Sequence, residues 1–503
     1  MTNDTETSLF EKFKEIGQHG IVFGLGTLLQ RAIGFVLIPL YTTHLTTSDY
    51  GVLGLITLTA AIIGSIFSLS LTGGLFRSYY DYDDEEDRKI VISTTLYLTA
   101  ISCVILFISG LFFPKYLSIL LFDNTNYEIH FLLIFISSIL GILNSIPFTI
   151  FRARKKSNQY VSLEIVFFLI GIGLIIYFVA VKNWGVFGIL LGQVMTGTIT
   201  LLTLYFCIRK DIVLKFSKLE ARKILLFSVP LVPANLTYFV MNYFDRYMLD
   251  YYCTLSMVGL YHLGYQFGMV IMTLLVMPLR LVWSPMFLSV KDHSNAKEFY
   301  SIALTYVIAI GSFLFLGLAL LSKEVIYLVA NEEYWGAYTV VPLITLTYLF
   351  YSVEIILNVG IGLMRKTKVV TLYFLIGAIA NIILNFALIP EYGIMGAAYA
   401  TLIAFVITII IVYFYNQKLV KINYEWDRIL KICLVTALIF TVGSIVVINN
   451  LYASIAFKVG IILFYPLILY LLQFYTTDEI RSLKKIFEYI FAKSKFNISI
   501  NRN

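Results

Sequence analysis

The chain has 503 residues, of which 59% are hydrophobic and only 13% are charged, and its formal net charge is +7. Soluble globular proteins carry about 25% charged residues. The composition therefore excludes an ordinary soluble protein and indicates an integral membrane protein with many spans. The four cysteines have no CxxC or paired spacing, so they are most simply plain helix residues.

Apolar runs recur along the whole chain, each bounded by charges or turn residues. A bilayer core about 30 Å thick needs roughly 20 such residues per helix, and fourteen runs meet this length. Their limits are 18–42, 49–74, 89–112, 128–151, 158–181, 185–208, 223–247, 256–280, 296–321, 337–363, 369–389, 393–416, 428–448 and 452–475. The sequence therefore predicts an all-α integral membrane fold with fourteen transmembrane helices.

The two ends of the chain lie outside these runs. Residues 1–16 are polar, and the apolar run that follows is too long for a signal peptide and lacks a cleavage site. We therefore expect that this N-terminal segment is not cleaved off. Near the C-terminus, Thr476 and Glu479 have the spacing of a capping box before a helix with one apolar face. This pattern predicts an amphipathic helix on the membrane surface, and a solvated tail is the alternative.

Lysine and arginine residues alternate between the two sides of the predicted bundle. If the N-terminus is cytoplasmic, nearly all of them fall in cytoplasmic segments, and the outer segments hold only Lys115, Lys182, Arg246 and Lys323. The positive-inside rule then places both termini in the cytoplasm, in a multi-pass protein of the cytoplasmic membrane. Since the basic residues act as topology signals, the net charge gives no reason to expect a nucleic-acid partner.

Two pairs of similar segments lie 208 residues apart. Gly51 in "TSDYGVLGL" matches Gly259 in "LSMVGLYHL", and Gly185 in "NWGVFGILLG" matches Gly393 in "EYGIMGAAYA". This repeat predicts two pseudo-symmetric six-helix lobes. The domains expected from it are 1–210, 211–420, the two additional helices of 421–476 and the tail of 477–503.

All predicted loops are short, which bears on the class of function. A membrane glycosyltransferase or polymerase of this size normally has a large external loop with acidic catalytic residues. The sequence also contains no Walker motif and no HExxH or CxxC pattern. We therefore expect a protein that is not an enzyme and has no bound metal or cofactor, with coupling to H⁺ or Na⁺ left open.

A polar stripe on the first predicted span contains Arg31. Its members recur at spacings of three and four residues and so share one helix face: Gly17, Gly20, Gly24, Thr27, Arg31 and Gly34. Close packing of small residues explains the glycines, but an arginine inside a membrane costs roughly 2.5–3.5 kcal/mol. We expect Arg31 and Thr27 to face a substrate cavity, and a structural ion pair for Arg31 is the alternative.

By the same offset, the seventh span corresponds to the first, and it too has a polar stripe. The stripe consists of Asn235, Tyr238, Asn242 and Asp245. Arg246 follows Asp245, and Arg280 ends the eighth span, so both are candidate cations for an anionic substrate. The alternative is that Asp245 and Arg246 cap the outer end and pair with other residues.

Candidate groups for ion coupling come from several spans. Glu354 lies deep in span ten, on one face with Tyr351 and Asn358. A buried carboxylate among polar neighbours can take up a proton or help to hold Na⁺, so Glu354 and Asp245 are candidates. For Glu354, a structural partnership with an arginine is the alternative.

Weaker candidates lie in three other spans. They are His262, Glu164, Asn381 and Asn385. Histidine is a residue that can titrate near neutral pH, but a lone histidine such as His262 near a helix end more often just makes a hydrogen bond. The two asparagines more often bridge helices than bind a substrate.

Four segments resemble the polysaccharide-flippase branch of the multidrug/oligosaccharidyl-lipid/polysaccharide exporter superfamily. They are "LIPLYTTHLTTSDYGVLGL", "FRSYYDYDDEEDRKIV", "YFDRYMLDYYCTLSMVGLYHLGYQFG" and "NIILNFALIPEYGIMGAAYATLIA". The sequence "QRAIGF" also resembles the Arg-x-x-Gly-Phe of the first helix in lipid II flippases. The resemblance implies two MATE-like lobes around a cavity that opens alternately to each side.

The resemblance also implies a function. Members carry undecaprenyl-pyrophosphate-linked oligosaccharides to the outer leaflet for O-antigen, capsule or related polymers, and Arg31 matches their cationic cavities by position. The expected partners are the lipid-linked oligosaccharide, membrane lipids and polysaccharide assembly proteins. The alternatives are a lipid II flippase, a multidrug exporter of the same superfamily, and, from another class, a membrane glycosyltransferase or polymerase.

Overall fold

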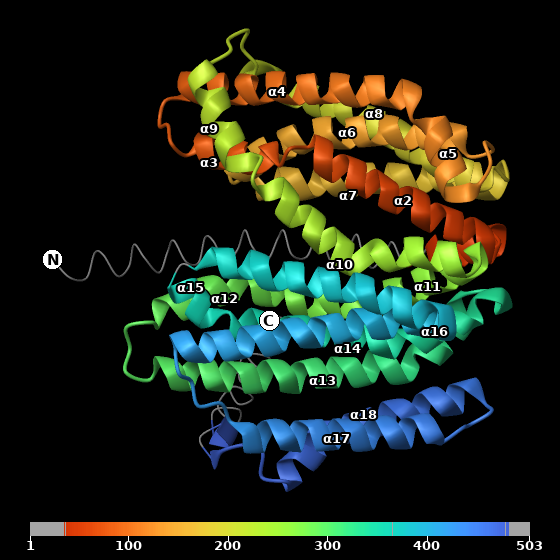
Figure 1. Cartoon of the computed structure of the whole chain (residues 1–503), viewed down its shortest axis with the longest axis vertical. Coiled ribbons are helices and arrows are strands. Elements are labelled where there is room, and N and C mark those ends of the chain that lie inside the picture. The colour runs from red at the N-terminus through yellow and green to blue at the C-terminus, as the bar shows by residue number, and fades with distance from the viewer. Residues whose placement is uncertain (1–34, 36, 365, 478, 482–503) are drawn as a thin grey trace, which may run out of the picture.

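A computed structural model of the chain describes residues 35, 37–364, 366–477 and 479–481. Within these residues every regular element is a helix, which confirms the all-α prediction (Figure 1). The physical reason is that a segment in hydrocarbon must satisfy its backbone N–H and C=O groups internally, and a helix does so within one segment.

A first group of helices lies at the top of Figure 1. It consists of α2 (Thr47–Phe67), α3 (Leu71–Tyr79), α4 (Glu85–Phe112), α5 (Pro114–Phe122), α6 (Glu128–Ala153), α7 (Ser157–Ile176), which a π-helical turn extends (Tyr177–Val181), and α8 (Gly185–Ile208). The short helix α9 (Lys218–Ser228) then crosses the ends of α3 and α4 and leads into α10 (Leu231–Tyr252).

A second group of helices lies below the first in Figure 1, and α10 passes from one group to the other. The group continues with α11 (Leu255–Gly268), a π-helical turn (Met272–Val276), α12 (Met277–Ser289), α13 (Ala296–Val329), a 3₁₀-helix (Glu332–Val340), α14 (Val341–Leu357), α15 (Val359–Leu363) and α16 (Thr367–Leu419). The hairpin of α17 (Trp426–Ile445) and α18 (Leu451–Leu471) packs along its far edge.

Eleven helices of the described residues are long and apolar enough to cross a membrane, or up to twelve if a bent pair counts as one span. The bent pair, Lys218–Thr237 and Phe239–Tyr252, turns by 43° within α10. Of the first predicted span, 18–42, only residues 35 and 37–42 are described. The total of fourteen spans and the domain boundaries therefore stay predictions.

α16 is a hairpin of two antiparallel arms. At Gly393, φ is +54° and ψ is −129°, a conformation that only glycine adopts without strain. Across the arms, a Cβ on Gly396 would lie 2.3 Å from the carbonyl oxygen of Leu388, and Asn381 Nδ2 lies 3.4 Å from Thr401 Oγ1. The two arms correspond to the predicted spans 369–389 and 393–416.

The predicted capping box at the C-terminal end is present in the structure. The backbone N–H of Thr476 donates to Glu479 Oε2 at 2.7 Å, and the N–H of Glu479 donates to Thr476 Oγ1 at 3.3 Å. This reciprocal pair fixes the start of the tail helix. Residues beyond 481 lie outside the described part of the chain, so the position of the tail on the membrane surface stays a prediction.

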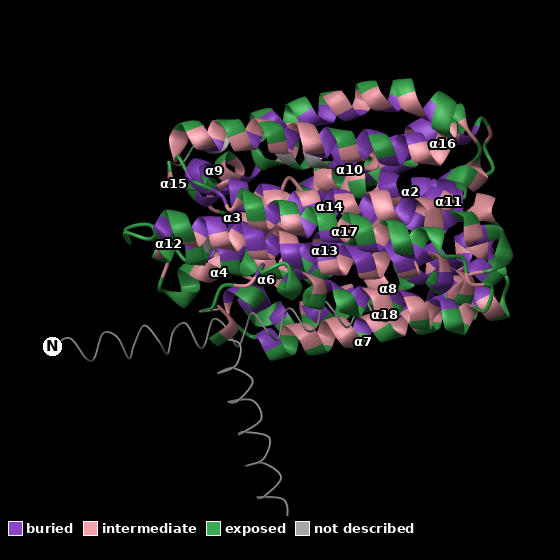
Figure 2. Cartoon of the chain, turned by 90° about the horizontal axis from the view of Figure 1, so that it is seen from below, coloured by how far each residue is buried: buried purple, intermediate pink, exposed green. Residues whose placement is uncertain are grey.

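Large apolar side chains cover the outer faces of the bundle. Leu202 of α8 and Ile445 of α17, for example, are 68% and 72% exposed. Figure 2 shows exposed and half-buried residues spread over the outer helices and buried residues between them. Such faces suit lipid contact, because lipid tails are as apolar as leucine.

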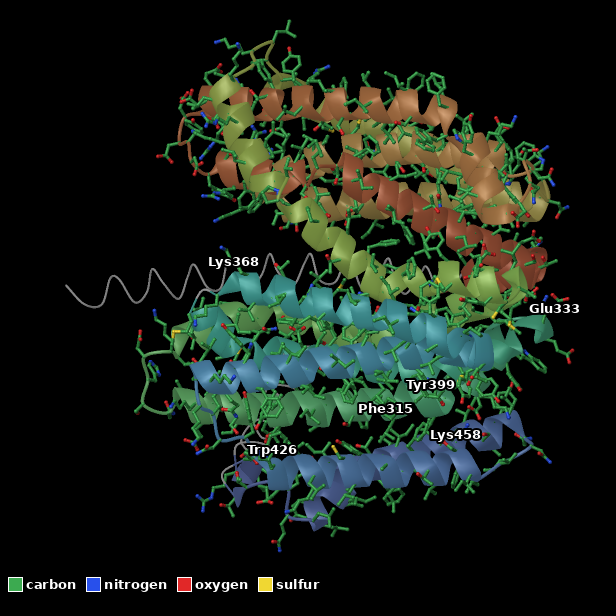
Figure 3. All side chains as sticks on the ribbon, in the orientation of Figure 1. Phe315, Glu333, Lys368, Tyr399, Trp426 and Lys458 are labelled. Carbon is green, nitrogen blue, oxygen red and sulfur yellow. The ribbon has the colours of Figure 1, made fainter. Side chains whose placement is uncertain are left out.

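An ion pair fastens the C-terminal hairpin to the second group. Lys458 of α18 lies within a predicted span, and its Nζ is 2.5 Å from Glu324 Oε1 of α13 (Figure 3). Ser454 Oγ donates to the same carboxylate oxygen at 2.7 Å. Both charged side chains are buried. The charge of Lys458 is thus compensated inside the protein and gives no reason to place a substrate there.

Candidate functional site

Two of the predicted substrate-binding residues, Arg31 and Thr27, lie outside the described residues. The other candidates are described: four on α10, and Arg280, Glu354, His262 and Glu164 on α12, α14, α11 and α7. Most of them therefore belong to the second group of helices.

Asp245 and Arg246 are adjacent on α10 and form a buried ion pair. Arg246 Nη1 lies 2.9 Å from Asp245 Oδ1 and also donates to the backbone carbonyl of Asn242 at 3.0 Å. The guanidinium carbon stands 4.0 Å from the centre of the Tyr265 ring, a cation–π contact. Arg246 is only 1% exposed. In this conformation its charge is compensated by neighbouring protein groups.

The second carboxylate oxygen of Asp245 belongs to a chain of polar groups between α10, α11 and α16. Tyr261 OH donates to Asp245 Oδ2 at 2.5 Å, and Thr401 Oγ1 lies 3.3 Å from the same oxygen. Asn381 contacts Thr401, and Asn385 Nδ2 donates to Asn381 Oδ1 at 2.9 Å. Asn385 Oδ1 is buried and accepts no hydrogen bond from the described residues. Carboxylate, hydroxyl and amide oxygens are the ligands that hard cations prefer.

Glu354 forms a second buried cluster, between α14 and α16. Its carboxylate accepts hydrogen bonds from Tyr373 OH and Asn358 Nδ2, and Asn358 Nδ2 lies 2.8 Å from Tyr373 OH. Glu354 is buried, whereas Arg280 is exposed and its guanidinium carbon stands 4.9 Å from the centre of the Tyr351 ring. The two clusters give the second group two separate buried carboxylates.

The predicted polar stripe of α10 does not converge on one surface. Asn242 is fully buried, and its Oδ1 accepts from Tyr348 OH at 3.3 Å. Asn235 is exposed, and its Nδ2 donates to Ser70 Oγ at 3.2 Å, next to the start of α3. Asn235 thus bridges the two groups of helices, while Asn242 fixes the packing within one.

The two weaker titratable candidates have different surroundings. His262 packs against α2, where a Cβ on Gly54 would lie 3.2 Å from its ring, and its Nε2 lies 3.1 Å from Gln266 Nε2. Glu164 lines a cavity of about 530 Å³ between α6, α7 and α8, together with Asn144. His262 is therefore placed at the contact between the groups, and Glu164 inside the first group.

Polar contacts close one end of the bundle between the two groups. Tyr50 OH of α2 donates to Gln266 Oε1 of α11 at 3.2 Å. Tyr334, in the 3₁₀-helix, donates its hydroxyl hydrogen to the backbone carbonyl of Thr46 at 2.8 Å. Side chains from both groups therefore hold this end of the bundle together. By the predicted topology, the end of the bundle at which these contacts lie is extracytoplasmic.

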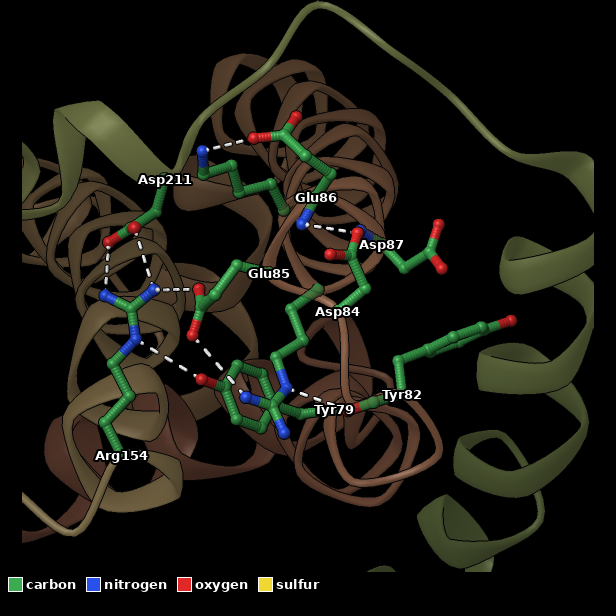
Figure 4. Close-up of polar contacts among 10 residues, drawn as sticks. Tyr79, Tyr82, Asp84, Glu85, Glu86, Asp87, Arg154 and Asp211 are labelled. Carbon is green, nitrogen blue, oxygen red and sulfur yellow. Dashed lines mark hydrogen bonds and ion pairs between the residues drawn. The ribbon is translucent and has the colours of Figure 1, made fainter.

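A network of charged groups lies at the opposite end of the first group (Figure 4). The Arg154 guanidinium donates to both oxygens of Asp211 at 2.8 Å and to Glu85 Oε2 at 3.2 Å. Although burial opposes it, hydrogen bonding to Asp211 and Tyr79 raises the pKa of Arg154 above its usual range. Glu85, from the acidic run 81–87, thus joins the ends of α4 and α6.

Sequence reasoning missed several residues of these clusters. Tyr261, Thr401 and Tyr373 are uncharged, and their sequence positions lie 16, 156 and 19 residues from the carboxylates they contact. The only available signal was helical spacing, since Tyr261 and Tyr265 stand four residues apart on α11. Such a stripe is more often ordinary core than a site.

The long apolar helices and their lipid-suited outer faces indicate a multi-pass membrane protein. Residues 16–291 match the family model described as polysaccharide biosynthesis protein. This match covers more than half of the chain, so the chain belongs to that family. The resemblance noted from the sequence is confirmed.

One curated relative and two solved structures agree with this assignment. The chain is 27% identical to the probable low-salt glycan biosynthesis flippase Agl15 of Haloferax volcanii over 125 residues. These residues cover 25% of this chain and only 26% of the length of that relative. The fold is similar to that of lipid II flippase MurJ in an inward closed conformation, with a TM-score of 0.71 and 18% identity over 90% of this chain and 99% of that one. An inward-facing multidrug resistance MATE family transporter follows with a TM-score of 0.62 and 12% identity, over 76% of this chain and 93% of that one.

Proposed function

We propose that this protein is a flippase for polyprenyl-pyrophosphate-linked oligosaccharides. It carries repeat units of O-antigen or capsule type from the cytoplasmic to the outer leaflet of the cytoplasmic membrane, by alternating access. The family match over residues 16–291 carries the proposal. A relative named as a glycan flippase and a fold similar to that of a lipid II flippase support the same class of substrate.

The lobes 1–210 and 211–420 are the moving bodies of the proposed cycle. The contact between α2 and α11 closes the end that the predicted topology makes extracytoplasmic, so the carrier would receive its substrate from the cytoplasmic side. Opening this contact while the opposite ends close would release the sugar outside. The lipid tail would remain in the bilayer, since hydrocarbon is its natural solvent.

The proposed site for the diphosphate is cationic. Arg31, with Thr27 one turn before it, would bind the phosphate oxygens through the several donors of its guanidinium. Arg280 supports this role by its exposure at the cytoplasmic end of its span. Arg246 is compensated by Asp245, so we assign it the task of holding α10 in place. Asn235, exposed between the groups, is a candidate contact for the sugars.

A cation gradient could reset the empty carrier through Asp245. The oxygens of Asp245, Thr401, Asn381 and Asn385 fit a proton or Na⁺, which would neutralise the carboxylate. Neutralising Asp245 would weaken its pair with Arg246 and thereby link ion binding to the packing of α10. Glu354 is the second candidate for this role.

Cells that lack the protein test the proposed substrate. We expect lipid-linked oligosaccharide to accumulate in the inner leaflet of these cells and the surface polysaccharide to be lost. Re-expression of the chain should restore export, and Arg31→Ala should not. Arg209→Ala is the matched control, because Arg209 is exposed and stacks on Phe206 at 4.1 Å within its own helix end. Full rescue by a properly expressed Arg31→Ala variant would overturn the assignment of Arg31.

A lipid II flippase is the second candidate, favoured by the TM-score of 0.71 to lipid II flippase MurJ. The two candidates differ in the cargo that accumulates. Loss of a lipid II flippase stops cell-wall growth, whereas loss of an oligosaccharide flippase leaves the wall intact and removes a surface polymer. Rescue of cells depleted of their lipid II flippase would decide for the second candidate.

A further inference from the structure

The outward face of α9 combines apolar and basic side chains. Leu219 and Leu226 are 63% and 67% exposed, and Lys218 and Arg222 are exposed beside them. An open groove of about 560 Å³ runs along the helix towards the start of α10, with mostly apolar walls and both cations in its lining. If this face were exposed to water, Leu219 and Leu226 would have no apolar groups to pack against.

The opposite face of α9 is fixed to the first group of helices. A Cβ on Gly74 of α3 would lie 2.4 Å from Ser228 Oγ and 3.1 Å from the carbonyl oxygen of Ile224. Tyr82 OH donates to Glu220 Oε1 at 2.7 Å. These contacts determine which face of α9 is buried, and they thereby fix which residues face outward.

The segment before α9 also fixes its depth. The backbone N–H of Ser217 donates to Thr94 Oγ1 of α4 at 3.1 Å, and the N–H of Val213 donates to Ser93 Oγ at 2.9 Å. These two α4 residues lie four and five positions past residue 89, where the predicted span begins. At 1.5 Å per residue, the segment is anchored roughly 6–8 Å along that span. α9 therefore starts at the level of the bilayer interface.

The charge of this surface is positive. Lys210, Lys215, Lys218 and Arg222 are exposed, and no ion pair with a described carboxylate involves them. The two acids within the segment are already compensated, Asp211 by Arg154 at 2.8 Å and Glu220 by Lys223 at 2.7 Å. Asp87 of α4 lines a neighbouring pocket together with Lys215 and Leu219. The free charges of the segment are thus all cationic.

We propose that the outward face of α9 is a docking surface for anionic phospholipid. Leu219 and Leu226 enter the boundary between headgroups and acyl chains, and Lys218 and Arg222 bind the phosphates of lipids in the same leaflet. Amphipathic helices with this distribution lie in the interface plane, and each cation near an anionic surface adds to the attraction. This surface is separate from the proposed transport path, so either proposal can fail without the other.

Site-directed quenching tests the docking surface. A bimane label at Leu226→Cys, in a full-length chain whose four native cysteines are serine, is placed in phosphatidylcholine vesicles and in equal mixtures with phosphatidylglycerol. Acyl-brominated phosphatidylglycerol or phosphatidylcholine then serves as the quencher. We expect strong quenching by both, and two- to threefold stronger quenching by the anionic lipid. Lys218→Gln with Arg222→Gln should abolish this preference.

Two further label positions make the result decisive. At Leu202→Cys, on a lipid-facing part of α8, both brominated lipids should quench equally. At Asp83→Cys, in an exposed loop, neither should quench. If the label at Leu226→Cys behaves like the one at Asp83→Cys and is quenched by aqueous iodide, the face is open to water or to a soluble partner and the proposal is wrong. If it shows the lipid ratio of Leu202→Cys, anionic selectivity is wrong.

Discussion

Gly51 of α2 and Gly259 of α11 are packed against each other in a reciprocal contact. A Cβ on Gly51 would lie 2.1 Å from the carbonyl oxygen of Leu255, and a Cβ on Gly259 would lie 2.0 Å from that of Thr47. Gly51 and Gly259 are 208 residues apart in sequence, and so are Thr47 and Leu255. A self-complementary contact of this kind is what an approximate twofold axis between the helices produces. This contact between the two groups of helices is therefore built from the two copies of one motif.

Substituting Gly51 by alanine should force α2 and α11 apart, because the added methyl group meets backbone rather than a movable side chain. We expect Gly51→Ala to lower the free energy of unfolding by about 1–3 kcal/mol, as overpacking does. Thermal unfolding of the purified protein in detergent measures this. Gly64→Ala, on the same helix with open space at its Cβ, is the control and should be neutral or stabilising by up to about 1 kcal/mol. Equal stability of the two variants would refute the close contact.

The ion pair between Lys458 and Glu324 should show strong coupling. Lys458→Met alone leaves a buried carboxylate without its cation and should cost about 3–5 kcal/mol. Adding Glu324→Leu removes the stranded charge and should recover most of the loss, because a buried pair can be replaced by apolar groups of similar volume. The double-mutant cycle is measured from apparent melting temperatures. If the stability losses of the two single variants simply add up in the double variant, the pairing is contradicted.

Replacement of Arg154 by lysine tests the network at the opposite end. A lysine keeps the charge but cannot hold both oxygens of Asp211 together with Glu85. We expect Arg154→Lys to cost about 1–2 kcal/mol of stability. The same exchange at the exposed Arg209 should change stability little. A loss at Arg209→Lys as large as that at Arg154→Lys would mean that the bidentate geometry is unimportant.

The sequence predicts helix positions well, because apolar length and turn residues are local properties. The break at Gly393 illustrates this, since the glycine lies between two predicted spans and has a positive φ. Its counterpart at Gly185 has a φ of +51°. Both positions were recognised as a repeat from local similarity alone.

The partners of the charged residues could not be predicted in the same way. Arg246 was a candidate cation for a substrate or, alternatively, a capping residue that pairs with other residues, but its particular partners, Asp245 and the ring of Tyr265, were not identified. Thr401 reaches Asp245 only because the α16 hairpin packs on α10. Contacts of this kind depend on tertiary packing between distant segments, and a single sequence carries no direct signal for them.

Charge-neutral substitutions distinguish the two coupling candidates. If Asp245 binds the coupling cation, Asp245→Asn should make transport independent of an imposed Na⁺ or pH gradient, while Glu354→Gln should retain the dependence. The measurement is the initial rate of transport into proteoliposomes with and without each gradient. Thr401→Ser keeps the hydroxyl and is the matched control. If instead Glu354→Gln loses the gradient dependence and Asp245→Asn retains it, Glu354 is the residue that binds the coupling cation.

Transport of a defined substrate by the purified protein tests the central claim most directly. Proteoliposomes are loaded with a labelled polyprenyl-pyrophosphate oligosaccharide, and the fraction reached by a membrane-impermeant glycosidase is followed over time. The proposed function predicts rapid exposure of the inner-leaflet pool with the native chain and at least a tenfold slower rate with Arg31→Ala, which Arg31→Lys should partly restore. Exposure no faster than in protein-free vesicles would contradict the proposal.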